Sequence, residues 1–184
     1  MKTLLWLYAV TGFMFDIANL LLKNVFHLNN HLTSNLFVLI EFLLISYYYK
    51  GRLLAGSMPA ALLIPALGLA FVAHTAIRSI FDFNSLGYSF FCFIYIIFSI
   101  LGFYSLLKNA EMIYIEQSGF FWVNVAFILY ASGSFLLLLF RYYMQQHDLQ
   151  LFDTLWGTSF LSLNILKYLF LAVALSKKAV IEPY

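Results

Sequence analysis

The sequence predicts an all-α protein, a polytopic bundle of six transmembrane helices. Of its 184 residues, 64% are hydrophobic and only 10% are charged, whereas a water-soluble domain carries about 25% charged residues. The mean hydropathy is +0.90. Six apolar runs follow one another along the chain, and each approaches the roughly 20 residues that a helix needs to cross a bilayer. This composition excludes a water-soluble enzyme, a disordered chain and a nucleic-acid-binding protein.

The six runs occupy almost the whole chain, so we expect a single transmembrane domain, 1–184, without a soluble domain. Pro59 and Pro65 suit the start and a kink of the third run. Asn84 or Ser85 suits the N-cap of the fourth, whose almost wholly apolar and aromatic sequence predicts a lipid-facing helix. Trp6, Trp122 and Trp156 lie near span ends, as in an aromatic belt. The predicted spans are 3–22, 33–49, 58–80, 86–107, 119–141 and 152–176.

The basic residues predict the orientation of the chain. With six spans, both termini lie on one side of the membrane. Lys and Arg are enriched on the cytoplasmic side, and the terminal side holds Lys2, Lys50, Arg52, Lys108, Lys177 and Lys178. The opposite side holds Lys23, Arg78 and Arg141. We therefore expect a multipass membrane protein with cytoplasmic N- and C-termini.

Two carboxylates lie inside the first two spans. Asp16 and Glu41 lie roughly 9 and 12 Å from the same membrane surface by helical rise, and Asn19 shares a helix face with Asp16. Each charge inside a bilayer costs at least ~2.5–3.5 kcal/mol and therefore requires a partner. The pattern indicates either a proton-carrying or cation-binding pair, or two acids that each bond a neighbour and fix helix register. Helix order is not encoded, so their pairing stays open.

A second polar group lies in the last two spans. Lys167 in the sixth span follows Asn164 by three residues, and Asp153 and Gly157 continue that stripe at helical spacing. Asn124 in the fifth span lies at a similar depth, so the sequence predicts a cluster of Asn124, Asn164 and Lys167. Lys167 is either a buried ion-pair or ligand anchor, within reach of Glu41 by depth, or a lysine that snorkels to the interface. The segment 132–134, with Ser132, suits close helix packing or a cavity wall.

The histidines offer a weak metal-site hypothesis. His27 and His31 have the i, i+4 spacing that directs two rings to one metal on a helix. His74 and His147 are expected on the same outer side. The first pair lacks a glutamate base, and interfacial histidines beside lipid headgroups are commoner. No motif requires a cofactor, and one cysteine forms neither an internal disulfide nor a thiolate cluster.

Several segments resemble a group of small multipass inner-membrane proteins of Bacteroidota with no established activity. The resemblance covers most of the chain. It rests on the segment Asn29-Asn30-His31, on 39–48 around Glu41, on 121–135 from Phe121 to Phe135, and on Asn164. It implies that Glu41, Asn124, Ser132, Gly133 and Asn164 are shared features, and that relatives are encoded near sensor histidine kinases. It implies no catalytic residue.

Three classes of function fit these features, and the lack of a catalytic motif favours a non-enzymatic one. The first is a subunit that senses a ligand or assembles with a membrane partner, such as a kinase, through its buried polar groups. The second is a small transporter or ion-coupled carrier that uses Asp16, Glu41 and Lys167. The third is a metal-dependent membrane hydrolase that uses the outer histidines. The expected partners are the lipid bilayer and a membrane protein or further copies of the chain, without nucleic acid.

Overall fold

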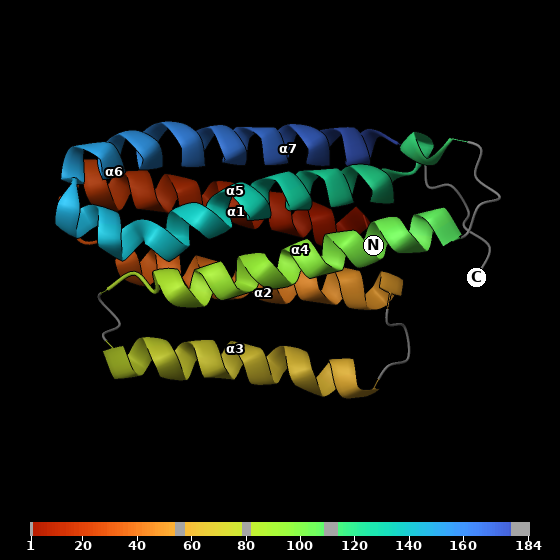
Figure 1. Ribbon diagram of the computed structural model, residues 1–184, viewed down its shortest axis with the longest axis horizontal. Coiled ribbons are helices and arrows are strands. Elements are labelled where there is room, and N and C mark those ends of the chain that lie inside the picture. Colours follow the sequence, from red (N-terminus) through yellow and green to blue (C-terminus); the bar gives the residue numbers. More distant parts are fainter. Residues whose placement is uncertain (1, 54–57, 79–81, 109–113, 178–184) are drawn as a thin grey trace. The chain divides into compact units, whose positions relative to one another are not determined.

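The computed structural model describes residues 2–53, 58–78, 82–108 and 114–177 (Figure 1). Every regular element among these residues is a helix, which confirms the all-α class. The long helices are α1 (Lys2–Asn24), α2 (His31–Leu53), α3 (Met58–Arg78), α4 (Ser85–Lys108) and α5 (Gly119–His147). A sixth helical rod consists of α6 (Leu149–Leu155), a π-helical turn η2 (Trp156–Phe160) and α7 (Leu161–Ser176). A short 3₁₀ turn, η1 (Ile115–Gln117), precedes α5.

The six helices lie where the apolar runs predict them. Five are long and apolar enough to cross a membrane, whereas the apolar stretch of α3 is shorter, Ala61–Ile77. The hairpin of α5 and the sixth rod is longer than expected, since α5 continues to His147 and α6 begins at Leu149. Residues 79–80 of the third predicted span and Lys178 lie outside the described residues.

The chain divides into two compact units, and the first, Met1–Gly87, contains α1, α2 and α3. Both α1 and α3 pack against α2. Phe15 on α1 meets Phe37 on α2, with ring centroids 5.3 Å apart. A Cβ on Gly68 of α3 would lie 3.4 Å from Leu39 of α2, so the third helix approaches the second closely at this glycine.

A buried amide network closes one end of this unit. Asn35 on α2 donates to the carbonyl of Asp82 (2.8 Å) and accepts from the amide of Asn84 (2.9 Å). The Asn84 side chain donates to Thr75 of α3 (2.8 Å) and accepts from the Gly87 amide (3.0 Å). Asn84 is therefore the N-cap of α4, as the sequence predicts, and it also ties α2 and α3 to the start of α4.

The second unit, Tyr88–Tyr184, is built on the contact between α5 and α7. The two helices run side by side along their length (Figure 1). A Cβ on Gly119 would lie 2.7 Å from the backbone oxygen of Ala174, and one on Gly133 would lie 2.6 Å from the side chain of Leu163. Glycine at these two positions lets the helix backbones approach each other.

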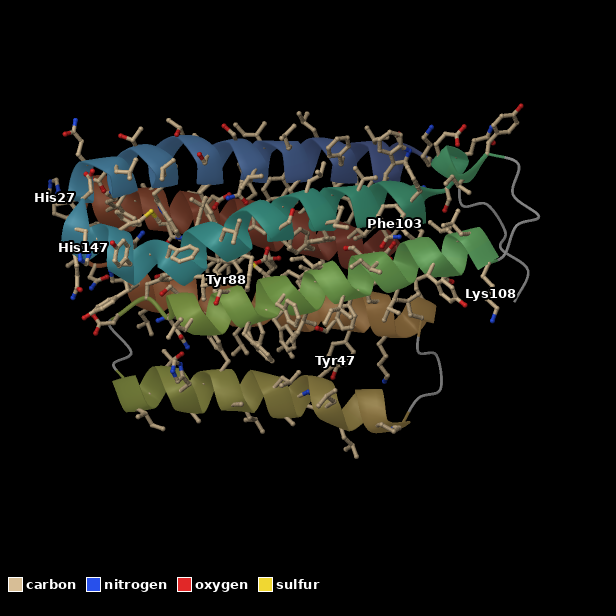
Figure 2. All side chains as sticks on the ribbon, in the orientation of Figure 1. His27, Tyr47, Tyr88, Phe103, Lys108 and His147 are labelled. Carbon is tan, nitrogen blue, oxygen red and sulfur yellow. The ribbon has the colours of Figure 1, made fainter. Side chains whose placement is uncertain are left out.

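The fourth helix packs on α5 through aromatic side chains. Phe103 on α4 meets Phe121 on α5, with ring centroids 5.7 Å apart (Figure 2). Tyr95 meets Phe127 at 5.9 Å. Most of the buried residues of α4 form a stripe that recurs every three or four positions: Tyr88, Cys92, Tyr95, Ser99, Gly102 and Leu106. The expectation that this helix faces lipid all round is therefore wrong, because one stripe of it is a packing face.

The π-helical turn changes which side chains of the sixth rod face α5. In a straight α-helix, Asp153 and Gly157 would lie on the stripe of Lys167, as the sequence pattern predicts. A π turn contains an extra residue, which rotates the preceding segment by about a quarter turn. As a result Phe152 is buried, whereas Asp153 and Gly157 are exposed.

The contacts around three glycines predict the order in which their Ala variants lose stability. We expect Gly119→Ala to destabilise the fold by about 1–3 kcal/mol, because the added methyl group meets a backbone oxygen that a side-chain rotation does not remove. Gly133→Ala should cost less, since the Leu163 side chain can move. Gly157→Ala is the matched control, because no atom lies within 4 Å of its Cβ position. Unfolding midpoints in mixed micelles measure this order, and equal midpoints for the Gly119 and Gly157 variants would contradict it.

Candidate functional site

Glu41 is fully buried in the first unit and is held by a tyrosine. Its exposed fraction is 0%, and its Oε1 accepts a hydrogen bond of 2.7 Å from the hydroxyl of Tyr8 on α1. Tyr8 is itself 1% exposed. This hydrogen bond agrees with the expectation that a carboxylate inside a membrane-spanning helix has a partner. Sequence reasoning does not single out Tyr8, which lies on the opposite helix and outside any polar motif.

Asp16 does not share this buried position, so its expected place in a buried site is wrong. The face of α1 that turns inward carries Leu5, Tyr8 and Gly12, at helical spacing. Asp16 is exposed, although it follows Gly12 by four residues, which is only about 40° around the helix. Asn19 is half-buried, and its Oδ1 has no hydrogen-bond partner among the described residues.

Lys167 is the buried cation of the second unit. Its exposed fraction is 1%, and its Nζ lies 3.8 Å from the ring centroid of Tyr130 on α5 and 5.0 Å from that of Tyr168. An ammonium over an aromatic face is attracted by the ring quadrupole. The Tyr130 hydroxyl is hydrogen-bonded to that of Tyr88 on α4. The lysine is thus held inside the helix packing rather than extended to a helix end.

The two asparagines of the predicted cluster lie in different surroundings. Asn124 on α5 is 0% exposed and lies against Gly102 of α4, whose Cβ would be 2.6 Å from the Asn124 Nδ2. Asn164 is half-buried and donates to the carbonyl of Phe160 at 3.3 Å, at the end of the π-helical turn. The structure therefore assigns Asn164 to local backbone bonding and Asn124 to the α4–α5 contact.

Ser132 is not part of the interior, and its neighbour Ser134 takes that place. Ser132 is exposed, and its hydroxyl donates to the carbonyl of Ile128 on its own helix at 2.6 Å. Ser134 is 0% exposed, and its Oγ has no hydrogen-bond partner among the described residues. The two serines are two residues apart, which places them on different sides of the helix.

The histidines do not form the predicted helical pair. His27 lies in the loop after α1 with a left-handed φ of 53°, and His31 is the first residue of α2. The His74 ring bonds Asn84 (3.1 Å), and the His147 ring donates to the carbonyl of Tyr143 (2.9 Å). In the part of the chain that the structure describes, no three His, Cys, Asp or Glu residues gather as metal ligands do.

The comparisons with known proteins add no relative. No protein family, curated protein or solved structure matches this chain. The resemblance to the small membrane proteins of Bacteroidota therefore remains a prediction. The class that the fold defines is a helical protein whose helices are long and apolar enough to cross a membrane.

The contact between Gly102 and Asn124 gives a test of the interior of the second unit. We expect Gly102→Ala to cost about 1–3 kcal/mol, because its methyl group would overlap the Asn124 amide. Combining it with Asn124→Ala should recover part of the loss, since the smaller side chain makes room. A double-mutant cycle on unfolding midpoints measures this coupling. Strictly additive losses would show that the two side chains do not meet.

Proposed function

We propose that the chain is a non-catalytic multipass membrane protein that senses a ligand or assembles with a membrane partner through the buried groups around Lys167. In this proposal it lies in the inner membrane with both termini in the cytoplasm. The observation that carries the proposal is the burial of Lys167, with its ammonium on the ring of Tyr130. An ionisable side chain inside membrane-spanning helices is costly and commonly marks a functional site.

The surroundings of Lys167 suit recognition better than bond cleavage. The charged group is seated on aromatic rings, from which it can interact with a carboxylate or phosphate of a ligand or with an acidic side chain of a partner helix. Ser134 adds a buried hydroxyl one helical turn beyond Tyr130 on α5. These groups bind and orient charge, and such contacts are sufficient for a sensor or an assembly subunit.

The proposal predicts a partner or ligand whose retention depends on the Lys167 charge. Lys167→Met keeps the length of the side chain and removes the ammonium, whereas Lys167→Arg keeps the charge. We expect the Met variant to lose a co-purifying protein or ligand that wild type and the Arg variant retain, at similar folded yield. Affinity purification in mild detergent with mass spectrometry measures this.

Lys23→Met is the control for the Lys167 variants, because Lys23 is an exposed cation at the end of α1. It should leave the co-purifying species unchanged. If the yield of folded Lys167→Met protein collapses and the Arg variant restores the yield without any bound species, Lys167 has a structural role only and the proposal fails.

A second candidate function is a small proton- or ion-coupled carrier, and the Tyr8–Glu41 contact favours it. A buried carboxylate with a hydroxyl donor is a group that can accept and release a proton or a cation during a transport cycle. This candidate uses Glu41 in the first unit, and it needs a pathway that the chain or several copies of it would provide.

The carrier predicts that Glu41→Gln abolishes flux while the protein still folds. The amide has the shape of the carboxyl group but does not carry the proton. Proteoliposomes loaded with a pH-sensitive dye report proton flux directly. Glu116→Gln is the matched control, since Glu116 is an exposed carboxylate in η1. Equal flux in the wild type, the Glu41 variant and protein-free vesicles would argue against a proton-coupled carrier.

A further inference from the structure

The turn between α5 and α6 carries a cation seated on aromatic rings. The Arg141 guanidinium carbon lies 5.4 Å from the ring centroid of Trp156 and 5.9 Å from that of Phe152. Trp156 stacks on Phe160 with centroids 4.5 Å apart and planes 6° apart. Phe152, Trp156 and Phe160 thus form a row of rings along the sixth rod, and Arg141 contacts the first two of them. The π-helical turn contains two of these rings, Trp156 and Phe160.

The position of this arginine along α5 matches a membrane boundary. Trp122, near the start of α5, stacks on Phe170 of α7 and donates from its indole nitrogen to the carbonyl of Glu116. Such an indole, apolar on its faces and bonded at its edge, is typical of the interface between hydrocarbon and water. Arg141 lies about 28 Å further along the helix, at 1.5 Å per residue. The hydrocarbon core is about 30 Å thick, so Arg141 lies at the level of the opposite headgroups.

The residues beyond Arg141 have the composition of a headgroup layer. Tyr142 is 68% and Tyr143 61% exposed, and His147 stacks on Tyr143 where α5 ends (Figure 2). Leu149 on α6 is 60% exposed. Aromatic side chains with polar tips, next to apolar ones, belong at the interface and not in free water.

We propose that this surface, Arg141 with the ring row Phe152–Trp156–Phe160, binds one phospholipid through its phosphodiester group. The guanidinium is planar and has five N–H donors, so it can bond a phosphate in addition to its protein contacts. The rings of Phe152 and Trp156 restrict its orientation. Phe152 is buried, whereas Trp156 and Phe160 are half-buried and offer an apolar surface to an acyl chain.

The acidic residues of this segment indicate which lipid headgroups fit the site. Asp148 and Asp153 are both exposed close to this turn, and one Asp148 oxygen accepts from the Leu151 amide at 2.8 Å. Two exposed carboxylates on this segment disfavour a headgroup with several negative charges. A phosphodiester with a single negative charge, as in phosphatidylethanolamine, fits this balance.

Native mass spectrometry of delipidated protein tests the proposal with two probes. Dioleoylphosphatidylethanolamine carries the phosphate, and dioleoylglycerol carries the same chains without it. We expect wild type to retain one phosphatidylethanolamine and little dioleoylglycerol. Arg141→Gln should weaken phosphatidylethanolamine binding about tenfold, the loss expected for a charge-assisted bond. Trp156→Leu should weaken it as well, because the arginine loses the ring on which it is seated.

The control variants distinguish a phospholipid site at Arg141 from nonspecific lipid adhesion and from a loss of folding. Lys23→Gln removes an exposed cation at the end of α1 and should leave retention unchanged. If Arg141→Gln does not fold, Arg141→Lys keeps the charge but loses the planar fork, and it should bind more weakly than wild type. Equal binding by wild type and the Arg141 variants overturns the proposal. Retention of dioleoylglycerol equal to that of phosphatidylethanolamine also overturns the proposal. So does the finding that a protein, and not the lipid, binds in a way that depends on Arg141.

Discussion

The packing of this protein depends on one constraint: the face of each helix that packs on protein is nearly as apolar as the face that is turned to lipid. When helices are apolar all round, burial of apolar area does not select a partner face, and close approach and polar contacts do so instead. The α5–α7 pair shows this at its two glycines, Gly119 against the Ala174 backbone and Gly133 against Leu163. These two contacts fix the height and the rotation of α7. Lys167 lies between Leu163 and Ala174 on α7 and therefore reaches the Tyr130 ring, which lies between the two glycines on α5.

The π-helical turn determines which side chains of the sixth rod face α5 near Arg141. By rotating α6 relative to α7, it brings Phe152 and Trp156 toward α5 and turns Asp153 outward. A continuous α-helix would place a carboxylate and a glycine where the rings now lie, and Arg141 would then lack the aromatic surface that it contacts. One inserted residue thus determines both which charge is exposed and where the arginine is held. Asn164, which donates to the Phe160 carbonyl, compensates part of the disturbed backbone bonding.

The sequence is sufficient to predict the helices but not their rotation about their own axes. The runs of apolar residues predict six helices. Glu41 and Lys167 are both buried, although the sequence leaves open whether Lys167 is buried or snorkels to the interface. Asp16 and Ser132 are exposed, and nothing in the mostly apolar sequences of α1 and α5 distinguishes these two positions from buried ones. No feature of the sequence predicts the π turn either. The packing stripe of α4 is likewise not predicted, because that helix is almost wholly apolar and aromatic and indicates only a lipid-facing helix.

Tyrosine is the residue through which this chain accommodates charge in both units. Glu41 takes the hydroxyl edge of Tyr8, whereas Lys167 takes the ring face of Tyr130. One side-chain type serves both signs of charge, because its hydroxyl donates to an anion and its π-face attracts a cation. Its apolar body meanwhile fills the interior as phenylalanine would. Tyr8 and Tyr130 therefore hold the two charged groups in helices that carry few other donors, which links the aromatic composition of the sequence to the positions of its two buried charges.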